Sequence, residues 1–292
     1  MKIAIYGRQF NDTALPYIQQ VFDNLVQHQA QIYVHRTLEG HLAGRIVTPA
    51  YNILEPGTDL KGLIDVFLTI GGDGTLLDMV TLIRDSGIPV IGINFGRLGF
   101  LASVNKNDIA AAIYAVVNKQ FTLDSRELLN IESESNVFGM DNFALNDVTI
   151  HKRDDSAMIT THAYLNGEIL NSYWGDGIII STSTGSTAYS LSCGGPIIFP
   201  QSNSIAITPI SPHNLNVRPI ILPDSSVLTF EVECRSANYL VSCDSRTAVI
   251  EQTMKFKVTK AGFQLNLVRL NNESYLTTLR NKLLWGLDVR NY

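Results

Sequence analysis

The chain has 292 residues, and because an ordinary domain has roughly 100 to 200 residues, we expect two domains. Hydrophobic residues make up 45% of the sequence and charged residues 17%, which favours packed cores and argues against wholesale disorder. The formal net charge is −5 and Lys and Arg form no basic run, so DNA and RNA are poor candidates as partners.

The cysteines and the apolar runs indicate the compartment. Cys193, Cys234 and Cys243 show no Cys-x-x-Cys spacing, so they predict neither a disulfide framework nor a zinc site and are most simply packing residues. The apolar run at the N-terminus is too short for a signal peptide, and no segment approaches the length of a membrane span. We therefore expect a cytoplasmic protein without a membrane partner.

The first 123 residues alternate short apolar runs with helical patterns, which is typical of βα units around a largely parallel sheet. The expected strands are residues 3–6, 31–35, 63–70 and 88–93, and the expected helices are residues 14–29, 75–85 and 107–119. We therefore predict a Rossmann-like α/β domain that binds phosphate over residues 1–123.

Residues 124–273 change to short runs rich in Val, Ile, Thr, Tyr and Phe, which predicts an antiparallel β-sandwich that binds the nucleotide. Asn166-Gly167 is an expected hairpin turn between residues 160–165 and 168–173, because both positions tolerate positive φ. Other expected strands are residues 178–181, 227–232, 239–242, 255–259 and 265–270. A helical pattern over residues 274–287 predicts that the C-terminal residues 274–292 return as a helix packed on the first domain.

A glycine motif follows the strongest apolar run of the first half. Residues 69–77 read TIGGDGTLL, where a predicted strand runs through a glycine turn into a predicted helix. Glycines around Asp73 let the backbone approach a bulky anion, and the free N–H groups of a helix start attract phosphate. No P-loop sequence is present. The alternative is that Asp73 or Thr75 only caps the helix.

The Gly-Gly-Asp-Gly-Thr string resembles the signature of a kinase superfamily that contains NAD kinases, phosphofructokinases, and diacylglycerol and sphingosine kinases. This resemblance implies phosphoryl transfer. Further segments in both halves resemble the NAD kinase family in particular, in the family's order along the chain. They are residues 92–94, 96, 98–101, 145–148, 175–177, 181–190, 194–196, 211–215 and 218–219.

The resemblance implies roles for individual residues. Asp73 matches the proton acceptor for the 2′-hydroxyl, and Gly74 matches a backbone position beside the dinucleotide. Asn146 and Asp147 match an Asn-Glu pair that holds the adenine and ribose end of NAD, and Asp176 matches an acid near the same nucleotide. The stretch lining the adenine pocket is matched by Thr187, Ala188, Tyr189 and Ser192.

The predicted function is that of an NAD kinase, which transfers the γ-phosphoryl group of ATP to the 2′-hydroxyl of the adenosine ribose of NAD and gives NADP. A ribose hydroxyl is a weak nucleophile and needs one carboxylate to take its proton. A divalent cation, Mg²⁺ by preference, is expected to bind with the triphosphate and not in a protein cage. The sequence does not show whether the phosphoryl donor is ATP or polyphosphate, or whether the acceptor is NAD or NADH. The resemblance implies a homodimer or homotetramer.

Alternatives remain for the function and for single residues. A lipid kinase of the diacylglycerol kinase type shares the glycine turn, and a non-catalytic dinucleotide-binding regulator could retain Asp73 by ancestry. Asn146-Asp147 could be an ordinary turn, the Ser- and Thr-rich residues 181–192 a solvated loop, and Tyr189 a core residue. The chemistry of His213 stays open.

Two positions depart from the family pattern. Asp244-Ser245-Arg246 stands where the family usually carries Asp-Gly-Gln, so the contact made by that Gln cannot be transferred to this chain. Arg246 could bind phosphate or have a structural role. Asp147 replaces the more usual Glu, which keeps the carboxylate but shortens its reach.

Overall fold

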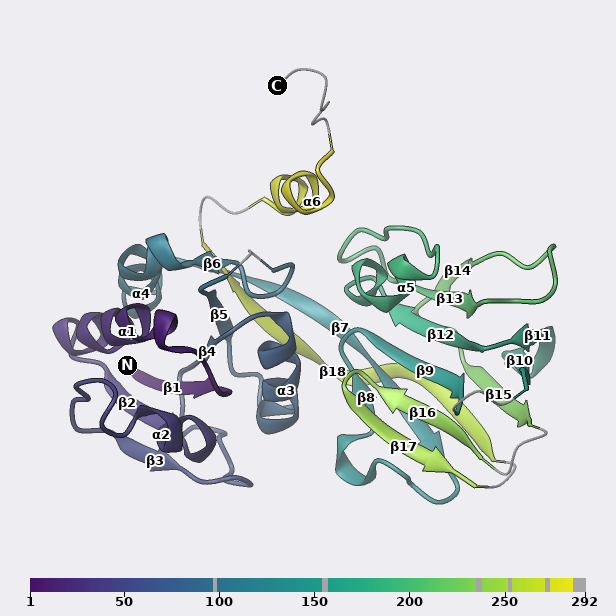
Figure 1. Ribbon diagram of the computed structural model, residues 1–292, viewed down its shortest axis with the longest axis horizontal. Helices are drawn as coiled ribbons and strands as arrows, with labels where there is room; N and C mark the ends of the chain where they lie inside the picture. The colour runs from purple at the N-terminus through teal and green to yellow at the C-terminus, as the bar shows by residue number, and fades with distance from the viewer. Residues whose placement is uncertain (97–98, 154–156, 235–237, 252–253, 271–273, 286–292) are drawn as a thin grey trace. The chain divides into compact units, whose positions relative to one another are not determined.

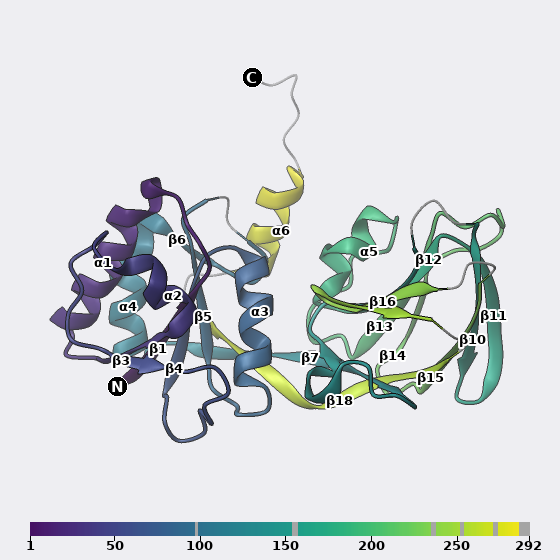
Figure 2. The ribbon, with the colours of Figure 1, turned by 60° about the horizontal axis from the view of Figure 1, so that its bottom comes forward.

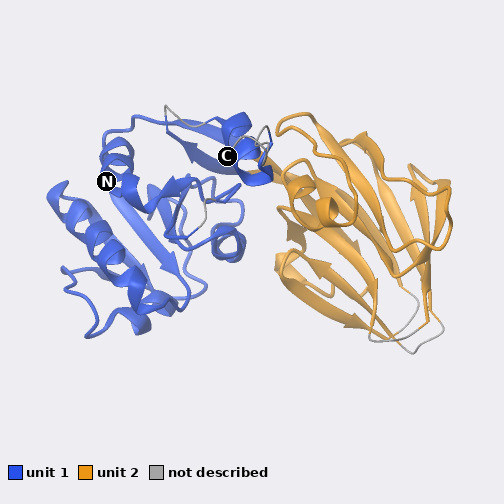
Figure 3. Ribbon diagram, turned by 45° about the horizontal axis from the view of Figure 1, so that its top comes forward, with its two compact units in different colours: residues 1–125, 265–292 blue, residues 126–264 orange. Residues whose placement is uncertain are grey.

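A computed structural model describes residues 1–96, 99–153, 157–234, 238–251, 254–270 and 274–285 (Figure 1). The chain divides into two compact units, residues 1–125 with 265–292, and residues 126–264 (Figure 3). Both divisions fall inside long strands, β7 (Thr122–Ser133) and β18 (Lys255–Arg269). The sequence had suggested a boundary at residue 273 and two separate strands, whereas β18 runs on through Gly262 as one strand.

The first unit is built on a parallel sheet with the strand order β5-β4-β1-β2-β3. The end of β18 and the short β6 also pair with β5 in parallel. Every residue of β4 is buried, which explains why a strand covered on both faces appears as a continuous apolar run. The strand bounds are β1 Lys2–Gly7, β2 Gln31–His35, β3 Asn52–Leu54, β4 Val66–Ile70, β5 Val90–Asn94 and β6 Val104–Asn105.

The helices of this unit are α1 Leu15–Gln27, α2 Arg36–Leu42, α3 Asp73–Ile83, α4 Ile109–Val117 and α6 Tyr275–Leu283. Helices α1 and α4 lie side by side and share a core with β1, β4 and β5 (Figure 2). In α6 the side chain of Leu279 is buried, and the Tyr275 ring lies 6.5 Å from that of Phe100. This contact agrees with the predicted return of the helix to the first unit; residues 286–292 of the predicted segment lie outside the described residues.

The second unit is a sandwich of two sheets. One has the antiparallel order β14-β13-β12-β9-β16-β17, and the other has the order β11-β10-β15-β18, with β7 beside β18 and β8 beside β7. The remaining bounds are β8 Phe143–Ala144, β9 Asp147–Lys152, β10 Ile159–Leu165, β11 Glu168–Gly175, β12 Gly177–Thr182, β13 Ser204–Ile210, β14 Ile220–Pro223, β15 Leu228–Glu233, β16 Tyr239–Cys243 and β17 Arg246–Ile250. The predicted fold class, α/β followed by antiparallel β, is confirmed.

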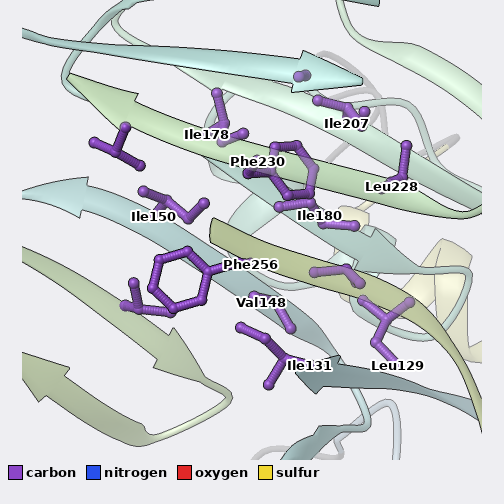
Figure 4. Packing of buried hydrophobic residues seen from close by; sticks show 14 of the residues in the cluster. Leu129, Ile131, Val148, Ile150, Ile178, Ile180, Ile207, Leu228, Phe230 and Phe256 are labelled. Atoms are coloured by element: carbon purple, nitrogen blue, oxygen red, sulfur yellow. The ribbon is translucent and has the colours of Figure 1, made fainter. Parts of the chain in front are cut away.

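The core of the sandwich fixes which side chains face outward. Val148 and Ile180, paired across β9 and β12, point into the core with Phe230 and Phe256 of the opposite sheet (Figure 4). Because side chains alternate along a strand, Asp147 and its cross-strand partner Ser181 lie on the other face. The outer face of this sheet therefore carries polar groups.

Short helices cover part of this face, where the sequence analysis predicted no helix. The helix α5 (Tyr189–Ser192) follows a 3-10 helix at Gly185–Thr187 and packs on β12. Other 3-10 helices are Asp12–Ala14, Lys106–Asp108 and Gly139–Asp141. The predicted hairpin turn is confirmed, with φ of 52° at Asn166 and 90° at Gly167. Over the described residues, no helix has both the length and the apolar character needed to cross a bilayer.

Candidate active site

The glycine turn lies between β4 and α3, at the carboxyl end of the parallel sheet. Gly71 has φ +148°, and a Cβ there would come within 2.3 Å of Thr75 Oγ1, so a larger residue does not fit. Gly72 is the N-cap of α3, and the helix begins at Asp73, two residues before the predicted start. Gly74 is exposed, and a Cβ built on it meets no atom within 4 Å. Packing thus explains Gly71 but gives no reason for Gly74.

The carboxylate of Asp73 holds a neighbouring loop. Its Oδ2 accepts a hydrogen bond from the N–H of Phe100 at 2.8 Å, and its Oδ1 accepts from Leu101 at 3.1 Å and Ala102 at 2.9 Å. A Cβ on Gly99 would lie 1.8 Å from Oδ1, so glycine is needed for this approach. No side chain caps α3, so the capping alternative is wrong, and a loop contact takes its place.

A carboxylate offers about four acceptor positions, and three are filled in Asp73. Among the residues that the structure describes, no second donor reaches Oδ2, so this oxygen can accept a further hydrogen bond. Gly99, Phe100 and Leu101 of this loop belong to the segment 98–101 that resembles the family, and Leu98 lies outside the described residues.

In the second unit, Asp147 begins β9 on the outer face of its sheet. It is 7% exposed, and Thr149 Oγ1 donates a hydrogen bond to its Oδ1 at 3.1 Å. Burial, helped by the negative charge of Asp244, raises the pKa of Asp147 to about 7. Near neutral pH this carboxyl group therefore exists partly as the acid, which can donate as well as accept a hydrogen bond.

Asp244 is a residue of this cluster that sequence reasoning did not select. It lies with Ser245 in the tight turn between β16 and β17, at φ 51°. Its carboxylate accepts hydrogen bonds from the N–H groups of Leu145 at 2.9 Å, Asn146 at 2.8 Å and Asp147 at 3.2 Å. The signal available in the sequence was an Asp in a two-residue turn between strand patterns, which indicates a hairpin but not its contact.

Arg246 supports the same turn. Its guanidinium lies 3.7 Å from Asp244, donates hydrogen bonds to the carbonyls of Asp141 and Phe143, and stands 5.2 Å from the centre of the Phe143 ring. Of the two interpretations left open by the sequence, phosphate or structure, these contacts agree with a structural role.

The Ser- and Thr-rich segment is joined to Asn146. Thr182 donates from its hydroxyl to the Leu145 carbonyl at 2.6 Å and from its N–H to the Asn146 carbonyl at 2.9 Å. A Cβ on Gly185 would lie 2.0 Å from that carbonyl oxygen, so only glycine fits. Residues 181–186 are buried, which excludes a solvated loop for this part of the segment.

The remaining predicted residues lie around this core. Tyr189 is 42% exposed, so it is not a core residue; burial raises its pKa, and so do its neighbour Cys193 and the negative charges of Asp147 and Asp176. Asp176 forms an ion pair with Lys152 at 2.9 Å. Three more predicted residues lie on the accessible side of the Ser- and Thr-rich segment: Thr187 and Ala188 are half-buried, and Ser192 is exposed.

The structure thus brings Asn146, Asp147, Asp176 and Tyr189 into one cluster of the second unit, while Asp73 and Gly74 belong to the first unit. The described parts of the chain contain no group of three or more His, Cys, Asp or Glu side chains arranged to hold a metal ion. An α/β unit with a glycine turn at a helix start, followed by a β-sandwich with clustered carboxylates, defines a class of two-unit nucleotide-binding proteins.

Comparison with known proteins gives the family. The model of the ATP-NAD kinase N-terminal domain matches residues 3–121, and that of the ATP-NAD kinase C-terminal domain matches residues 145–270. The chain is 45% identical over 293 residues to the NAD kinase of Cytophaga hutchinsonii and 43% identical over 294 residues to that of Flavobacterium psychrophilum, with 100% of each chain covered. The chain belongs to the NAD kinase family, which confirms the family and the enzyme class predicted from the sequence.

Solved structures show the same fold. Yeast NADH kinase complexed with NADH has a TM-score of 0.87 at 22% identity, with 100% of this chain and 89% of that chain covered. An NAD kinase from Archaeoglobus fulgidus in complex with ATP has a TM-score of 0.75 at 20% identity, with 97% and 99% covered. None of these relatives supports the lipid kinase or the regulator that the sequence left as alternatives.

Proposed function

We propose that the chain transfers the γ-phosphoryl group of ATP to the 2′-hydroxyl of the adenosine ribose of NAD, with NADP and ADP as products. The family matches in both halves of the chain support this reaction. The observation that carries it is the joining of residues 145–147 to residues 182–185, because two segments that resemble the family separately pack as one structure.

Asn146, Asp147 and Asp176 are proposed to bind the adenine and ribose end of NAD. Ribose hydroxyls both donate and accept hydrogen bonds, and an Asp147 with a pKa of about 7 can do the same near neutral pH. Thr187, Ala188, Tyr189 and Ser192 are proposed to line the adenine pocket, and their partial or full exposure leaves them accessible to a ligand.

Asp73 is proposed to take the proton from the attacking hydroxyl. Its open acceptor position on Oδ2 can receive that hydroxyl while the loop contacts hold the carboxylate in place. General-base help of this kind is worth roughly 10² to 10⁴ in rate. Gly74 is proposed to lie beside the dinucleotide. The close approach of the ligand would then require a glycine at this position, which packing within the protein does not require.

Mg²⁺ enters this proposal as part of the substrate Mg·ATP, where it neutralises the triphosphate. We also propose that the chain works in the cytoplasm, where its three free cysteines stay reduced, and that it assembles as a homodimer or homotetramer. Light scattering of the purified protein tests the assembly.

The test of the reaction is incubation of the purified chain with NAD and Mg·ATP, followed by mass-spectrometric detection of NADP. Parallel reactions with NADH, with polyphosphate and with diacylglycerol define the acceptor and the donor. Phosphorylation of diacylglycerol without formation of NADP would overturn the proposal.

A further inference from the structure

The β16–β17 turn places one buried carboxylate beneath the segment that carries Asn146 and Asp147. Three successive backbone N–H groups, those of Leu145, Asn146 and Asp147, point at the two oxygens of Asp244. The side chain of Asp244 is only 2% exposed, so this contact is shielded from water. Charge-assisted hydrogen bonds in such a place fix the backbone that they join.

Arg246 holds the carboxylate from the other side. Its bonds to the carbonyls of Asp141 and Phe143 tie the turn to the chain just before Leu145. The turn is thus attached both to the segment it supports and to the chain just before that segment.

We propose that Asp244 is a positioning residue for the nucleotide site, which fixes the backbone of Leu145–Asp147 and sets the electrostatic surroundings of the Asp147 carboxyl group. This inference rests on the proposed function of Asn146 and Asp147. It assigns to the turn a role that acts through those residues and not through a contact with substrate.

Among the described residues, the titratable groups that face Asp147 come from two elements. Cys243 and Asp244 face it from the hairpin, and Tyr189 and Cys193 face it from α5 and the residue that follows. Asp244 has three amide donors and a nearby guanidinium, whereas Asp147 has one hydroxyl donor. Burial raises the pKa of Asp244 as well, but its three amide donors and the Arg246 guanidinium oppose this shift, so Asp244 is the better site for the negative charge of the pair.

The variant Asp244→Asn tests this role, because its amide retains one acceptor oxygen but removes the charge. We expect KM for NAD to rise at least about tenfold while kcat at saturating NAD changes by less than about threefold. Asp224→Asn is the matched control, since Asp224 pairs with Lys260 elsewhere in the same unit. An unchanged KM in a folded Asp244→Asn protein would overturn the proposal.

A second measurement needs no substrate and so separates this inference from the proposed reaction. Carbon-13 NMR of the full chain follows the carboxyl group of Asp147, with Asp147→Asn to assign its signal. We expect a titration near pH 7 that moves to lower pH by about one unit in Asp244→Asn. An Asp147 that titrates at the same pH in both proteins refutes the electrostatic role even if NADP is formed.

If Asp244→Asn does not fold, Asp244→Glu takes its place, since it keeps the charge but displaces it by one methylene. It should raise KM for NAD and leave the titration of Asp147 near pH 7. A wild-type KM in this variant would show that the position of the carboxylate has no effect.

Discussion

Replacement of Asp73 by asparagine separates the observed contacts of this carboxylate from its proposed role as proton acceptor. The amide of Asn can still accept from Leu101 and Ala102 through its oxygen, but its NH₂ then faces the N–H of Phe100. The loss of one charge-assisted hydrogen bond costs about 1.5 to 3 kcal/mol. A unit of this size then unfolds at a temperature about 5 °C lower.

Because of these loop contacts, we expect Asp73→Asn to lower stability as well as turnover. The assay combines thermal unfolding, NAD binding and kcat measured below the unfolding transition. We expect kcat to fall by roughly 10² to 10⁴ while NAD binding survives. Asp85→Asn is the control, because Asp85 is exposed just after the same helix. A near-normal kcat refutes the general base, and an unchanged Tm refutes the loop contact.

Three further substitutions test single contacts. Gly74→Ala should raise Tm slightly, since alanine favours a helix by about 1 kcal/mol over glycine and meets no atom here, yet lower activity by crowding the ligand; undiminished turnover would contradict this. Arg246→Ala should lower Tm by several degrees, because two carbonyls lose their hydrogen-bond donor. It should raise KM for NAD less than Asp147→Ala does. A larger rise in KM for Arg246→Ala would show that Arg246 is a substrate ligand. Urea unfolding should show that Asp147→Asn is more stable than wild type at pH 8, by up to about 4 kcal/mol, and that this gain disappears toward pH 4. A gain in stability that does not depend on pH would refute the pKa assigned to Asp147.

The sign of that last effect follows from the direction of the pKa shift. Folding raises the pKa of Asp147 from 3.8 to about 7, so the folded state binds the proton more tightly than the unfolded chain. The stability that this proton confers is present below pH 4 and is lost as the pH rises through 7. Asparagine cannot ionise, so the variant does not lose it.

The sequence predicted several elements whose burial produces a clear pattern, but not β9 or β13, which are also largely buried. Strand β4 is buried at every residue, and α1 buries Ile18, Val21, Phe22 and Leu25 at helical spacing, so both were expected. The predicted elements did not include β3 or α5, since a strand of three residues or a helix of four is too short for a period to show.

The site could be predicted only in part. Asp73 and residues 145–147 were selected through family resemblance, because no local spacing reveals which distant segments meet. The contact from Asp73 to the N–H of Phe100 spans 27 residues, and that from Asp244 to Leu145 spans 99. Bonds from a side chain to a remote backbone N–H depend on the folded chain and leave no periodic signal in the sequence.

The formation of NADP by the purified chain tests the central claim most directly. With NAD and Mg·ATP we expect one ADP for each NADP, and with EDTA in excess of Mg²⁺ we expect neither, because the triphosphate keeps its full charge. Full activity in excess chelator would contradict the mechanism. Tight binding of NAD without any NADP, from a folded protein supplied with Mg·ATP, would contradict the claim that this chain is an active kinase of NAD.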